Sequence, residues 1–156
     1  MMGDDWDHYL CRLGDDLGSI YLNLGLRTDA PIATHAEVTI VSVPLLHPTD
    51  RGMSSDAEFD TLISLEDDLS AAAAAEQSIY AGRLTARGSR VFYFYTADPA
   101  ALSDVIGAAM ARHVPYRFTI TGHADAEWSL YLNLLFPGPD ALQQIRDRRR
   151  SAAAEE

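Results

Sequence analysis

The sequence contains no lysine and only one cysteine, Cys11, among its 156 residues. A single cysteine excludes an internal disulfide and a cysteine-based metal cluster within one chain. No hydrophobic run reaches the roughly 20 residues that span a bilayer. The first residues, Met-Met-Gly-Asp-Asp, lack the basic and apolar regions of a secretory signal. We therefore expect a soluble, cytoplasmic protein that does not bind membranes.

The motifs of several enzyme classes are absent as well. No His-Glu-x-x-His pattern for zinc occurs, and neither Gly82 nor Gly88 lies in a glycine-rich segment that follows a strand and opens a helix, as phosphate-binding loops do. Cys11 lies in an expected strand, where a small apolar residue fits, so we interpret it as structural rather than nucleophilic. The sequence thus predicts no catalytic residue, no metal ion and no cofactor, and it favours a protein that is not an enzyme.

Positive charge is scarce: 12 basic residues, all arginine, face 23 acidic ones, for a net charge of −11. Residues 1–76 contain 15 acidic and 3 basic residues, whereas residues 77–156 contain 8 and 9. Because a binding site for phosphate groups needs basic side chains, we expect neither nucleic acid nor an anionic membrane as a partner. The acidic half is interpreted as a solvated surface, with an acidic docking face as the alternative.

What the sequence does contain is a central, aromatic hairpin pattern. Residues 80–85 and 91–95 alternate between two faces, as in a pleated strand. The short loop between them contains Gly88, which can adopt a positive φ at low steric cost. The pattern predicts two antiparallel strands joined by a tight turn at Arg87-Gly88.

A strand and a helix are predicted on each side of this hairpin. A strand over residues 37–43 precedes a helix that begins at a capping box, Ser55 to Glu58. This helix has an apolar stripe formed by Phe59, Leu62, Leu65, Leu69, Ala72 and Ala73. Asp98-Pro99 predicts the start of a second helix, and a strand is expected over residues 116–121. This order is that of the ferredoxin-like fold, in which two helices cover one face of an antiparallel sheet.

Further strands are expected to extend this sheet. Residues 6–13 and 17–25 predict an N-terminal hairpin, and residues 127–136 predict a strand that a short helix follows. The pentapeptides Ile20–Leu24 and Leu130–Leu134 are similar, and shared β-propensity favours coincidence over an internal repeat.

The predicted fold class is α+β: a ferredoxin-like βαββαβ antiparallel sheet extended by an N-terminal β-hairpin and a C-terminal strand and helix. The length is that of one domain, so residues 1–150 are expected to form a single α+β domain. Residues 151–156 are expected to be a frayed C-terminal tail.

Two groups of polar residues are candidates for a site. His123, Asp125 and Glu127 alternate on an extended segment and could ligate a metal or act as acid and base, but a polar turn explains them equally well. The arginines of the central hairpin and its tyrosines could bind a carboxylate or phosphate, or the arginines could pair with the acidic half of the chain. The candidate ligand-binding residues are Arg83, Arg90, Tyr93, Tyr95, Asp125, Glu127 and Trp128.

Several motifs together resemble an uncharacterised bacterial family, domain of unknown function 695. They are Trp6-x-x-Tyr9, Ile20-x-Leu22-Asn23-Leu24, Leu65-Glu66-Asp67-Asp68-Leu69, Tyr80-Ala81-Gly82-Arg83-x-Thr85, Arg90-Val91-Phe92-Tyr93-Phe94-Tyr95 and Asp125-x-Glu127-Trp128-x-x-Tyr131. The resemblance covers most of the chain. It implies a fold related to the acidic inhibitor B of ribonuclease E, which acts by binding a protein, and it supplies no catalytic residues.

Two functions follow as hypotheses. The first is a non-enzymatic protein-binding or regulatory domain with an unidentified protein partner. The second is a small anionic-ligand binder or enzyme with a site beside the central hairpin. Because edge strands of an open sheet tend to pair, a homodimer remains an open alternative.

Overall fold

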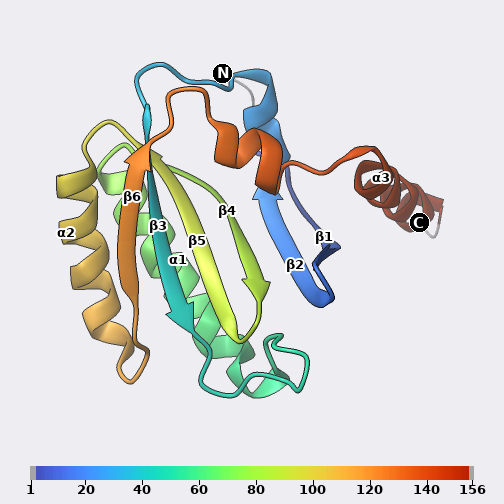
Figure 1. Cartoon of the computed structure of the whole chain (residues 1–156), viewed down its shortest axis with the longest axis horizontal. Helices are drawn as coiled ribbons and strands as arrows, with labels where there is room; N and C mark the ends of the chain where they lie inside the picture. Colours follow the sequence, from blue (N-terminus) through green and yellow to red (C-terminus); the bar gives the residue numbers. More distant parts are fainter. Residues whose placement is uncertain (1–2, 155–156) are drawn as a thin grey trace.

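A six-stranded antiparallel sheet forms the centre of the protein (Figure 1). The computed structural model describes residues 3–154. The strands are β1 (Trp6–Leu13), β2 (Asp16–Asn23), β3 (Glu37–Pro44), β4 (Ile79–Ala86), β5 (Ser89–Thr96) and β6 (Thr119–Ala124). Their order across the sheet is β1-β2-β4-β5-β3-β6, and every neighbouring pair is antiparallel. The predicted α+β class is therefore confirmed.

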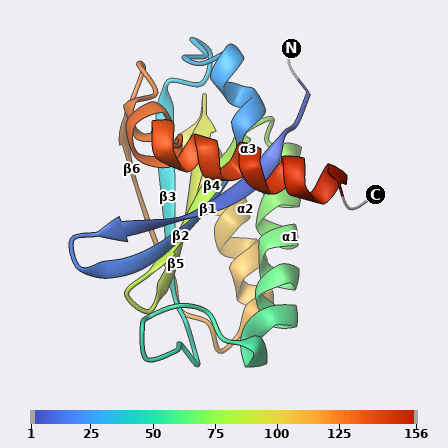
Figure 2. The same ribbon diagram turned by 90° about the vertical axis from the view of Figure 1, so that its right-hand side faces the viewer.

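Helices α1 (Phe59–Ala75) and α2 (Pro99–Met110) cover one face of the sheet (Figures 1 and 2). Between them and the sheet lies a core of buried side chains that includes Leu65, Phe92 and Ile106. The predicted cap of α2 is confirmed, because the Asp98 carboxylate accepts a hydrogen bond from the Ala101 amide at 3.1 Å. Among residues 3–154, no helix has the length and apolar character needed to cross a lipid bilayer.

Both predicted hairpins are present. Strands β1 and β2 pair from Trp6 and Asn23 to Leu13 and Asp16, and β2 continues the sheet by pairing with β4. The turn between β4 and β5 has φ angles of 53° at Arg87 and 81° at Gly88, so the glycine takes the expected positive φ. The N-terminal hairpin thus extends the sheet as predicted.

The predicted C-terminal strand over residues 127–136 is wrong. Residues Leu130–Leu135 form a π-helical turn, η4, that packs on the face of the sheet opposite α1 and α2. Trp128, Tyr131 and Leu135 are fully buried there, at the three- and four-residue spacing of a helix. The expected picture of a sheet covered on one side only is corrected, because a second apolar core lies on the other face.

The capping box predicted at the start of α1 is also wrong. A 3₁₀ turn, η2 (Asp56–Glu58), precedes the helix, and the Ser55 side chain makes no capping hydrogen bond. The Glu58 carboxylate instead accepts hydrogen bonds from the Leu46 amide at 3.0 Å, the His47 amide and the Tyr116 hydroxyl at 2.5 Å. Long-range partners therefore take the place of the local cap.

The apolar stripe of α1 is confirmed except at its first residue. Leu62, Leu65, Leu69 and Ala73 are buried, whereas Phe59 is 61% exposed. Strand β6 begins three residues later than the expected strand and ends at Ala124. Short 3₁₀ turns, η1 (Leu24–Thr28) and η3 (Ala111–His113), follow β2 and α2.

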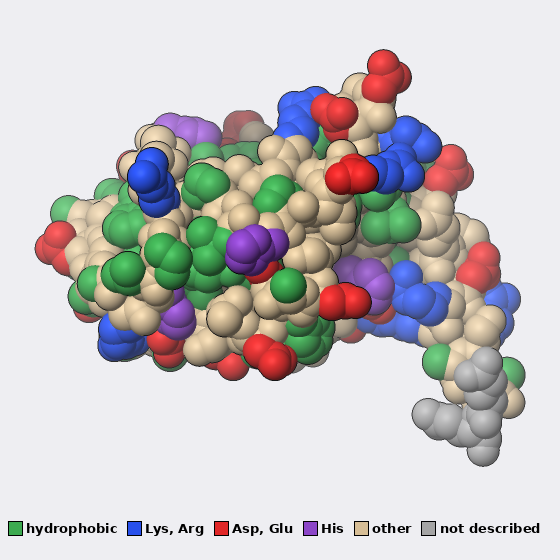
Figure 3. Space-filling view, turned by 90° about the horizontal axis from the view of Figure 1, so that it is seen from below, with side chains coloured by type: hydrophobic (Ala, Val, Ile, Leu, Met, Phe, Trp, Pro, Cys, Tyr) green, Lys and Arg blue, Asp and Glu red, His purple; other side chains and the backbone are tan. Residues whose placement is uncertain are grey.

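The last helix, α3 (Pro139–Ala154), lies beside β1 (Figure 2). It continues four residues into the segment expected to be a frayed tail, and Glu155 and Glu156 lie outside the described residues. Arg149 pairs with Asp5 at 2.8 Å and with Asp7 at 2.7 Å. The basic end of the chain thus neutralises part of its acidic start, and Figure 3 shows acidic and basic side chains interspersed on the side of α3.

Candidate functional site

Two pockets adjoin α1. The larger lies between the C-terminal half of α1, the start of β4 and residues 23–33, and the smaller lies between the N-terminal part of α1 and the β1–β2 hairpin, on the α1 side of the sheet. Helices α1 and α2 pack mainly over β3, β4 and β5, which leaves this side of β1 and β2 without a covering helix. One pocket adjoins the C-terminal half of α1 and the other its N-terminal end. These pockets are the candidate functional site.

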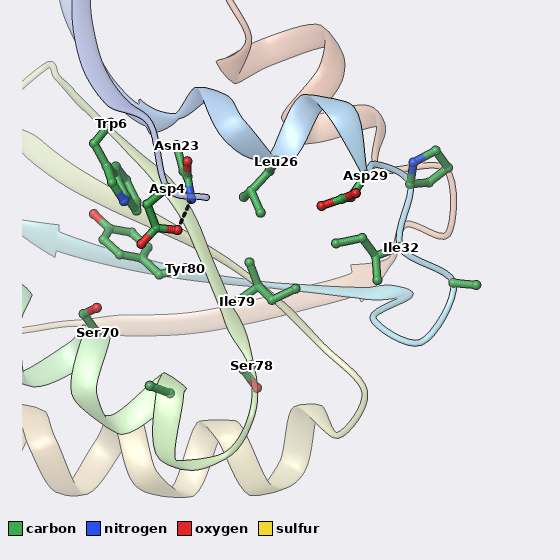
Figure 4. A pocket seen from close by; sticks show the side chains of 13 residues that line it. Asp4, Trp6, Asn23, Leu26, Asp29, Ile32, Ser70, Ser78, Ile79 and Tyr80 are labelled. Carbon is green, nitrogen blue, oxygen red and sulfur yellow. Dashed lines mark hydrogen bonds between the residues drawn. The ribbon is translucent and has the colours of Figure 1, made fainter. Parts of the chain in front are cut away.

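The larger pocket has a volume of about 670 Å³ (Figure 4). That volume is within the range typical of small-molecule sites. Its lining is mostly apolar and includes two carboxylates; the lining residues are Asp4, Trp6, Asn23, Leu26, Asp29, Pro31, Ile32, Ala33, Ser70, Ala74, Ser78, Ile79 and Tyr80. In Figure 4, Trp6 and Tyr80 lie at one end and Asp29 and Ile32 at the other, with Leu26 and Ile79 between them.

Asn23 holds the first carboxylate in place. Its side-chain amide donates to Asp4 Oδ1 at 3.0 Å, as the dashed line in Figure 4 shows. Its side-chain oxygen, Oδ1, accepts hydrogen bonds from the backbone amides of Asp5 at 2.9 Å and Gly25 at 3.1 Å. Asn23 is itself 4% exposed, so this network fixes the position of Asp4 at the point where β2 ends.

A stack of aromatic rings forms the wall of this pocket. The Trp6 ring lies 4.9 Å from Tyr21 and 5.1 Å from Tyr80, measured between centroids. The Tyr80 hydroxyl donates to Glu66 Oε2 at 2.8 Å, and its burial raises the pKa of the tyrosine. The wall is therefore held at both ends, by ring packing and by a charge-assisted hydrogen bond.

An ion pair lies between the two pockets. Arg83 Nη1 is 3.2 Å from Glu66 Oε1, and the Arg83 guanidinium lies 4.5 Å from the centre of the Tyr21 ring. Both charged side chains are mostly buried, with 21% and 15% of their surface exposed. This arrangement confirms that one hairpin arginine pairs with the acidic half of the chain, and Arg87 does the same with Asp16 at 2.7 Å.

The smaller pocket, of about 360 Å³, contains the third hairpin arginine. Arg90 is 8% exposed, and its Nε and Nη2 donate to Thr85 Oγ1 at 2.9 Å and Ser54 Oγ at 3.2 Å. Burial, together with the nearby Arg83, lowers the pKa of Arg90 to about 10. Arg90 therefore remains a cation at neutral pH, and its two side-chain contacts are neutral hydroxyls.

The structure does not bring the seven predicted site residues together. Arg83 and Arg90 line the smaller pocket on the α1 side of the sheet. Tyr93 and Tyr95 belong to the core on the opposite face, together with Trp128. Glu127 is exposed, outside both groups. A single cleft formed by all these residues is therefore excluded, because alternate residues of β5 point to opposite faces.

The residues on the opposite face form a buried network. Asp125 Oδ2 accepts from the Tyr95 hydroxyl at 2.7 Å and the Leu130 amide at 3.0 Å, and Oδ1 accepts from the Ser129 amide at 2.9 Å. Burial acts to raise the pKa of Asp125, but these hydrogen bonds outweigh it and hold the pKa below its usual value. Asp125 thus starts the turn that carries Trp128, whose ring stacks on Tyr95 at 3.9 Å.

The other polar candidates remain apart. His123 is exposed on the edge strand β6 and Asp125 is buried, so they do not converge with Glu127. Within residues 3–154, no group of three or more His, Cys, Asp or Glu side chains could hold a metal ion. Cys11 is half-buried in β1, and burial raises the pKa of its thiol, which is the opposite of nucleophilic activation.

Sequence reasoning missed the residues of the larger pocket. Asp4, Asp29 and Tyr80 are far apart along the chain, and no spacing rule connects them. The one signal in the sequence is the acidic surplus of residues 1–76, which predicts either a solvated surface or an acidic docking face.

Residues 4–136 match the model of a family described as a family of unknown function, DUF695. The match covers most of the chain and includes both pockets, so the protein belongs to this family, as the motifs indicated. A comparison with curated proteins found no match.

Proposed function

We propose that this member of the DUF695 family is a non-enzymatic protein-binding domain with a regulatory role. Its larger pocket would receive a short segment of a partner protein in which a large apolar residue lies next to lysine or arginine. One observation carries the proposal: the pocket combines an apolar lining with two carboxylates, and none of its lining residues is basic.

The two kinds of lining residue would have different tasks. Leu26, Ile32 and Ile79 would bury the apolar side chain, which is the main source of affinity at such contacts. Asp4, beside Trp6 and Tyr80, and Asp29, at the opposite end of the pocket, would be two alternative positions for the cation, so that the apolar residue could lie on either side of it. A neutral or acidic segment would lose the contact with a carboxylate.

The charge of the whole protein supports a basic partner. The net charge of −11 creates a negative field that attracts basic segments and speeds their association. Asp60 and Asp67 are exposed on α1 and contribute to this field on the side of the pockets. A cytoplasmic location, where such a partner would be met, is part of the proposal.

The proposal includes a ferredoxin-like core, with the kinship to ribonuclease E inhibitor B that the motifs imply. The chain order β3-α1-β4-β5-α2-β6 and the sheet order β4-β5-β3-β6 support it. Superposition of residues 37–124 on a structure of that inhibitor would test the kinship: a different order of the matched strands would remove it. A second copy of the chain is the alternative partner, and light scattering of the purified protein would detect a dimer.

Binding of defined peptides tests the proposal. Short blocked peptides that contain Leu-Arg are compared with matched peptides that contain Leu-Glu or Gly-Arg, and Trp6 fluorescence reports binding. We expect the Leu-Arg peptide to bind most tightly and the double variant Asp4→Asn/Asp29→Asn to bind it at least about tenfold more weakly, which corresponds to about 1.4 kcal/mol.

The matched control is Asp15→Asn/Asp50→Asn, which removes the same charge from two exposed positions outside the pocket. It should retain most of the affinity. Equal weakening by both double variants would reduce the effect to net charge, and equal affinity for all three peptides would exclude the proposed segment.

A further inference from the structure

Strand β6 forms an edge of the sheet at which backbone groups have no partner (Figure 1). It pairs with β3 on one side, and within residues 3–154 no strand lies on its other side. The Asp125 amide donates to the Ala36 carbonyl at 2.8 Å, in continuation of the β3–β6 register. Because hydrogen-bonded positions alternate along an antiparallel pair, every second residue of β6 directs its N–H and C=O groups away from β3. These residues are Ile120, Gly122 and Ala124.

The opposite edge of the sheet, formed by β1, is protected. Helix α3 lies beside β1, and Arg148 donates a hydrogen bond to the backbone carbonyl of His8 at 2.6 Å. Edge strands are commonly protected by such a cover, by charged side chains, by proline or by a β-bulge. Strand β6, with the sequence Thr-Ile-Thr-Gly-His-Ala, contains no Asp, Glu, Lys, Arg or Pro, and its register with β3 is regular. The edge of β6 is therefore open to a further strand.

The approach to this edge is free of the two covering helices. Figure 2 shows α1 and α2 in a layer of their own on one face of the sheet, not in its plane. Residues 117–124 contain no acidic side chain, in a chain that has 23 of them. Two copies of this acidic protein thus meet least repulsion between nearby charges at β6.

The charges at the two ends of β6 indicate a second copy in the antiparallel direction. Arg117 precedes the strand and Glu127 follows it; both are exposed, and within residues 3–154 neither forms an ion pair. Antiparallel copies place Arg117 of each copy near Glu127 of the other, whereas parallel copies place like charges side by side. With a two-fold axis at Gly122, Ile120 of one copy lies opposite Ala124 of the other. A large apolar side chain then meets a small one, and no two like charges face each other across the strands.

We propose that two copies of this chain pair through β6, antiparallel and with a two-fold axis at Gly122, to form one continuous sheet. This assigns an interface to the homodimer that the sequence left open. The interface consists mainly of one six-residue strand from each copy, which is small for a protein dimer, so the dimer is weak. No lining residue of either pocket belongs to β6. The dimer therefore leaves the larger pocket free, and the peptide-binding role and the dimer can fail independently.

Analytical ultracentrifugation of the full chain, from micromolar to millimolar concentration, tests the proposal. We expect the mass to rise from that of one copy to that of two. The amides of Ile120, Gly122 and Ala124 should exchange more slowly at the higher concentration, as followed by NMR. A protein that stays monomeric at millimolar concentration would overturn the proposal and would leave a strand of another protein as the occupant. A dimer without slower exchange at these amides would overturn it as well.

Exchange of the two charges tests the antiparallel direction. Arg117→Glu and Glu127→Arg should each weaken the dimer about tenfold, because each variant turns two symmetric attractions into repulsions. The double variant Arg117→Glu/Glu127→Arg should restore most of the affinity. The matched control is Arg12→Glu, which makes the same charge change on β1 at the opposite edge. Equal weakening by Arg12→Glu, or no recovery in the double variant, would contradict the antiparallel pairing.

A proline tests the backbone pairing itself. The Ala124 amide is directed away from β3, and an edge strand tolerates proline at such a position. Ala124→Pro should therefore remain folded by circular dichroism and lose the dimer. A folded Ala124→Pro variant that dimerises as the wild type does would exclude pairing through this edge. The charge variants lie at exposed positions and decide the question if Ala124→Pro does not fold.

Discussion

The Tyr95 hydroxyl lies 2.7 Å from Asp125 Oδ2 and joins the central hairpin to the segment that covers the second face of the sheet. The same hydroxyl accepts a hydrogen bond from the Tyr131 amide at 3.1 Å. The Tyr131 hydroxyl in turn donates a hydrogen bond to the backbone carbonyl of Asn23 at 2.6 Å. This chain of contacts connects β5, η4 and the end of β2, so two residues that the sequence suggested for ligand binding, Tyr95 and Asp125, instead hold η4 on the second face of the sheet.

Removing the Tyr95 hydroxyl should therefore destabilise the protein. We expect Tyr95→Phe to lower the free energy of unfolding by about 1–3 kcal/mol, because buried Asp125 loses a donor and the Tyr131 amide loses an acceptor. Denaturant unfolding followed by fluorescence measures the change. Tyr93→Phe is the matched control, since Tyr93 is on the same face of the same strand and takes no part in this network. A loss of equal size in Tyr93→Phe would show that the hydroxyl bonds are not the cause.

The Asp125 carboxylate should make stability depend on acid pH. Its pKa in the folded protein lies below the usual aspartate value of 3.8, so its stabilisation is fully present above that value and is lost as the pH falls through the folded pKa. Asp125→Asn cannot lose a charge in this way. We expect the stability difference between wild type and variant to shrink from about pH 6 to about pH 2. A difference that stays constant over this range in denaturant titrations would contradict the assignment.

The contacts of α3 with the start of the chain should be measurable by hydrogen exchange. Arg148 and Arg149 bind Asp7, and the Asp7 pKa is lowered because the hydrogen bonds from His8, Arg149 and Arg148 outweigh the effect of burial. We expect Arg148→Ala/Arg149→Ala to speed amide exchange in α3, by an amount that matches about 1 kcal/mol or less per pair. High salt should produce part of the same effect in the wild type.

Arg150→Ala is the matched control for α3, because Arg150 pairs only with Asp147 of the same helix among the residues described. It should leave exchange in α3 close to that of the wild type. Equal acceleration in both variants would mean that helix propensity, rather than attachment to β1, sets the exchange rate.

Two glycines should respond to alanine in opposite directions. Gly52 has a φ of 77°, and a Cβ there would lie 2.8 Å from the amide nitrogens of Arg87 and Gly88. Gly52→Ala should therefore destabilise the protein by about 1–3 kcal/mol. Gly107 lies within α2, where a Cβ would meet nothing within 4 Å, so Gly107→Ala should stabilise it by up to about 1 kcal/mol. Thermal unfolding of the two variants checks both signs, and a stabilising Gly52→Ala would contradict the backbone conformation.

The sequence predicted the strands that alternate clearly and the helices with an apolar stripe, because these signals are local. It failed where distant groups decide the conformation. Ile20–Leu24 and Leu130–Leu134 are nearly identical, yet the first belongs mostly to β2 and the second to η4. The difference lies in Asp125, whose carboxylate binds the Ser129 and Leu130 amides and starts a helical turn. The helical spacing of Trp128, Tyr131 and Leu135 was the signal that the strand interpretation overlooked.

The candidate site was predictable only in part, for a similar reason. Arg83 of β4 and Arg90 of β5 lie on one face of the hairpin, as strand alternation predicts. The groups that surround the two arginines come from β1, β2, the loop before α1 and α1 itself. No spacing pattern in the sequence predicts that these segments lie next to the hairpin. Glu58 shows the same limit, because its partners Leu46, His47 and Tyr116 are brought to it only by folding.

The order of the strands also determines when the sheet can form during synthesis. Strand β3 lies between β5 and β6, and both of these neighbours follow it in the chain, as β4 follows its neighbour β2. A nascent chain that ends before β4 therefore holds one hairpin and an apolar strand with both edges open. Such chains expose apolar surface and unpaired strand edges that promote aggregation. Most of the protein must therefore emerge from the ribosome before β3 can be buried in the sheet.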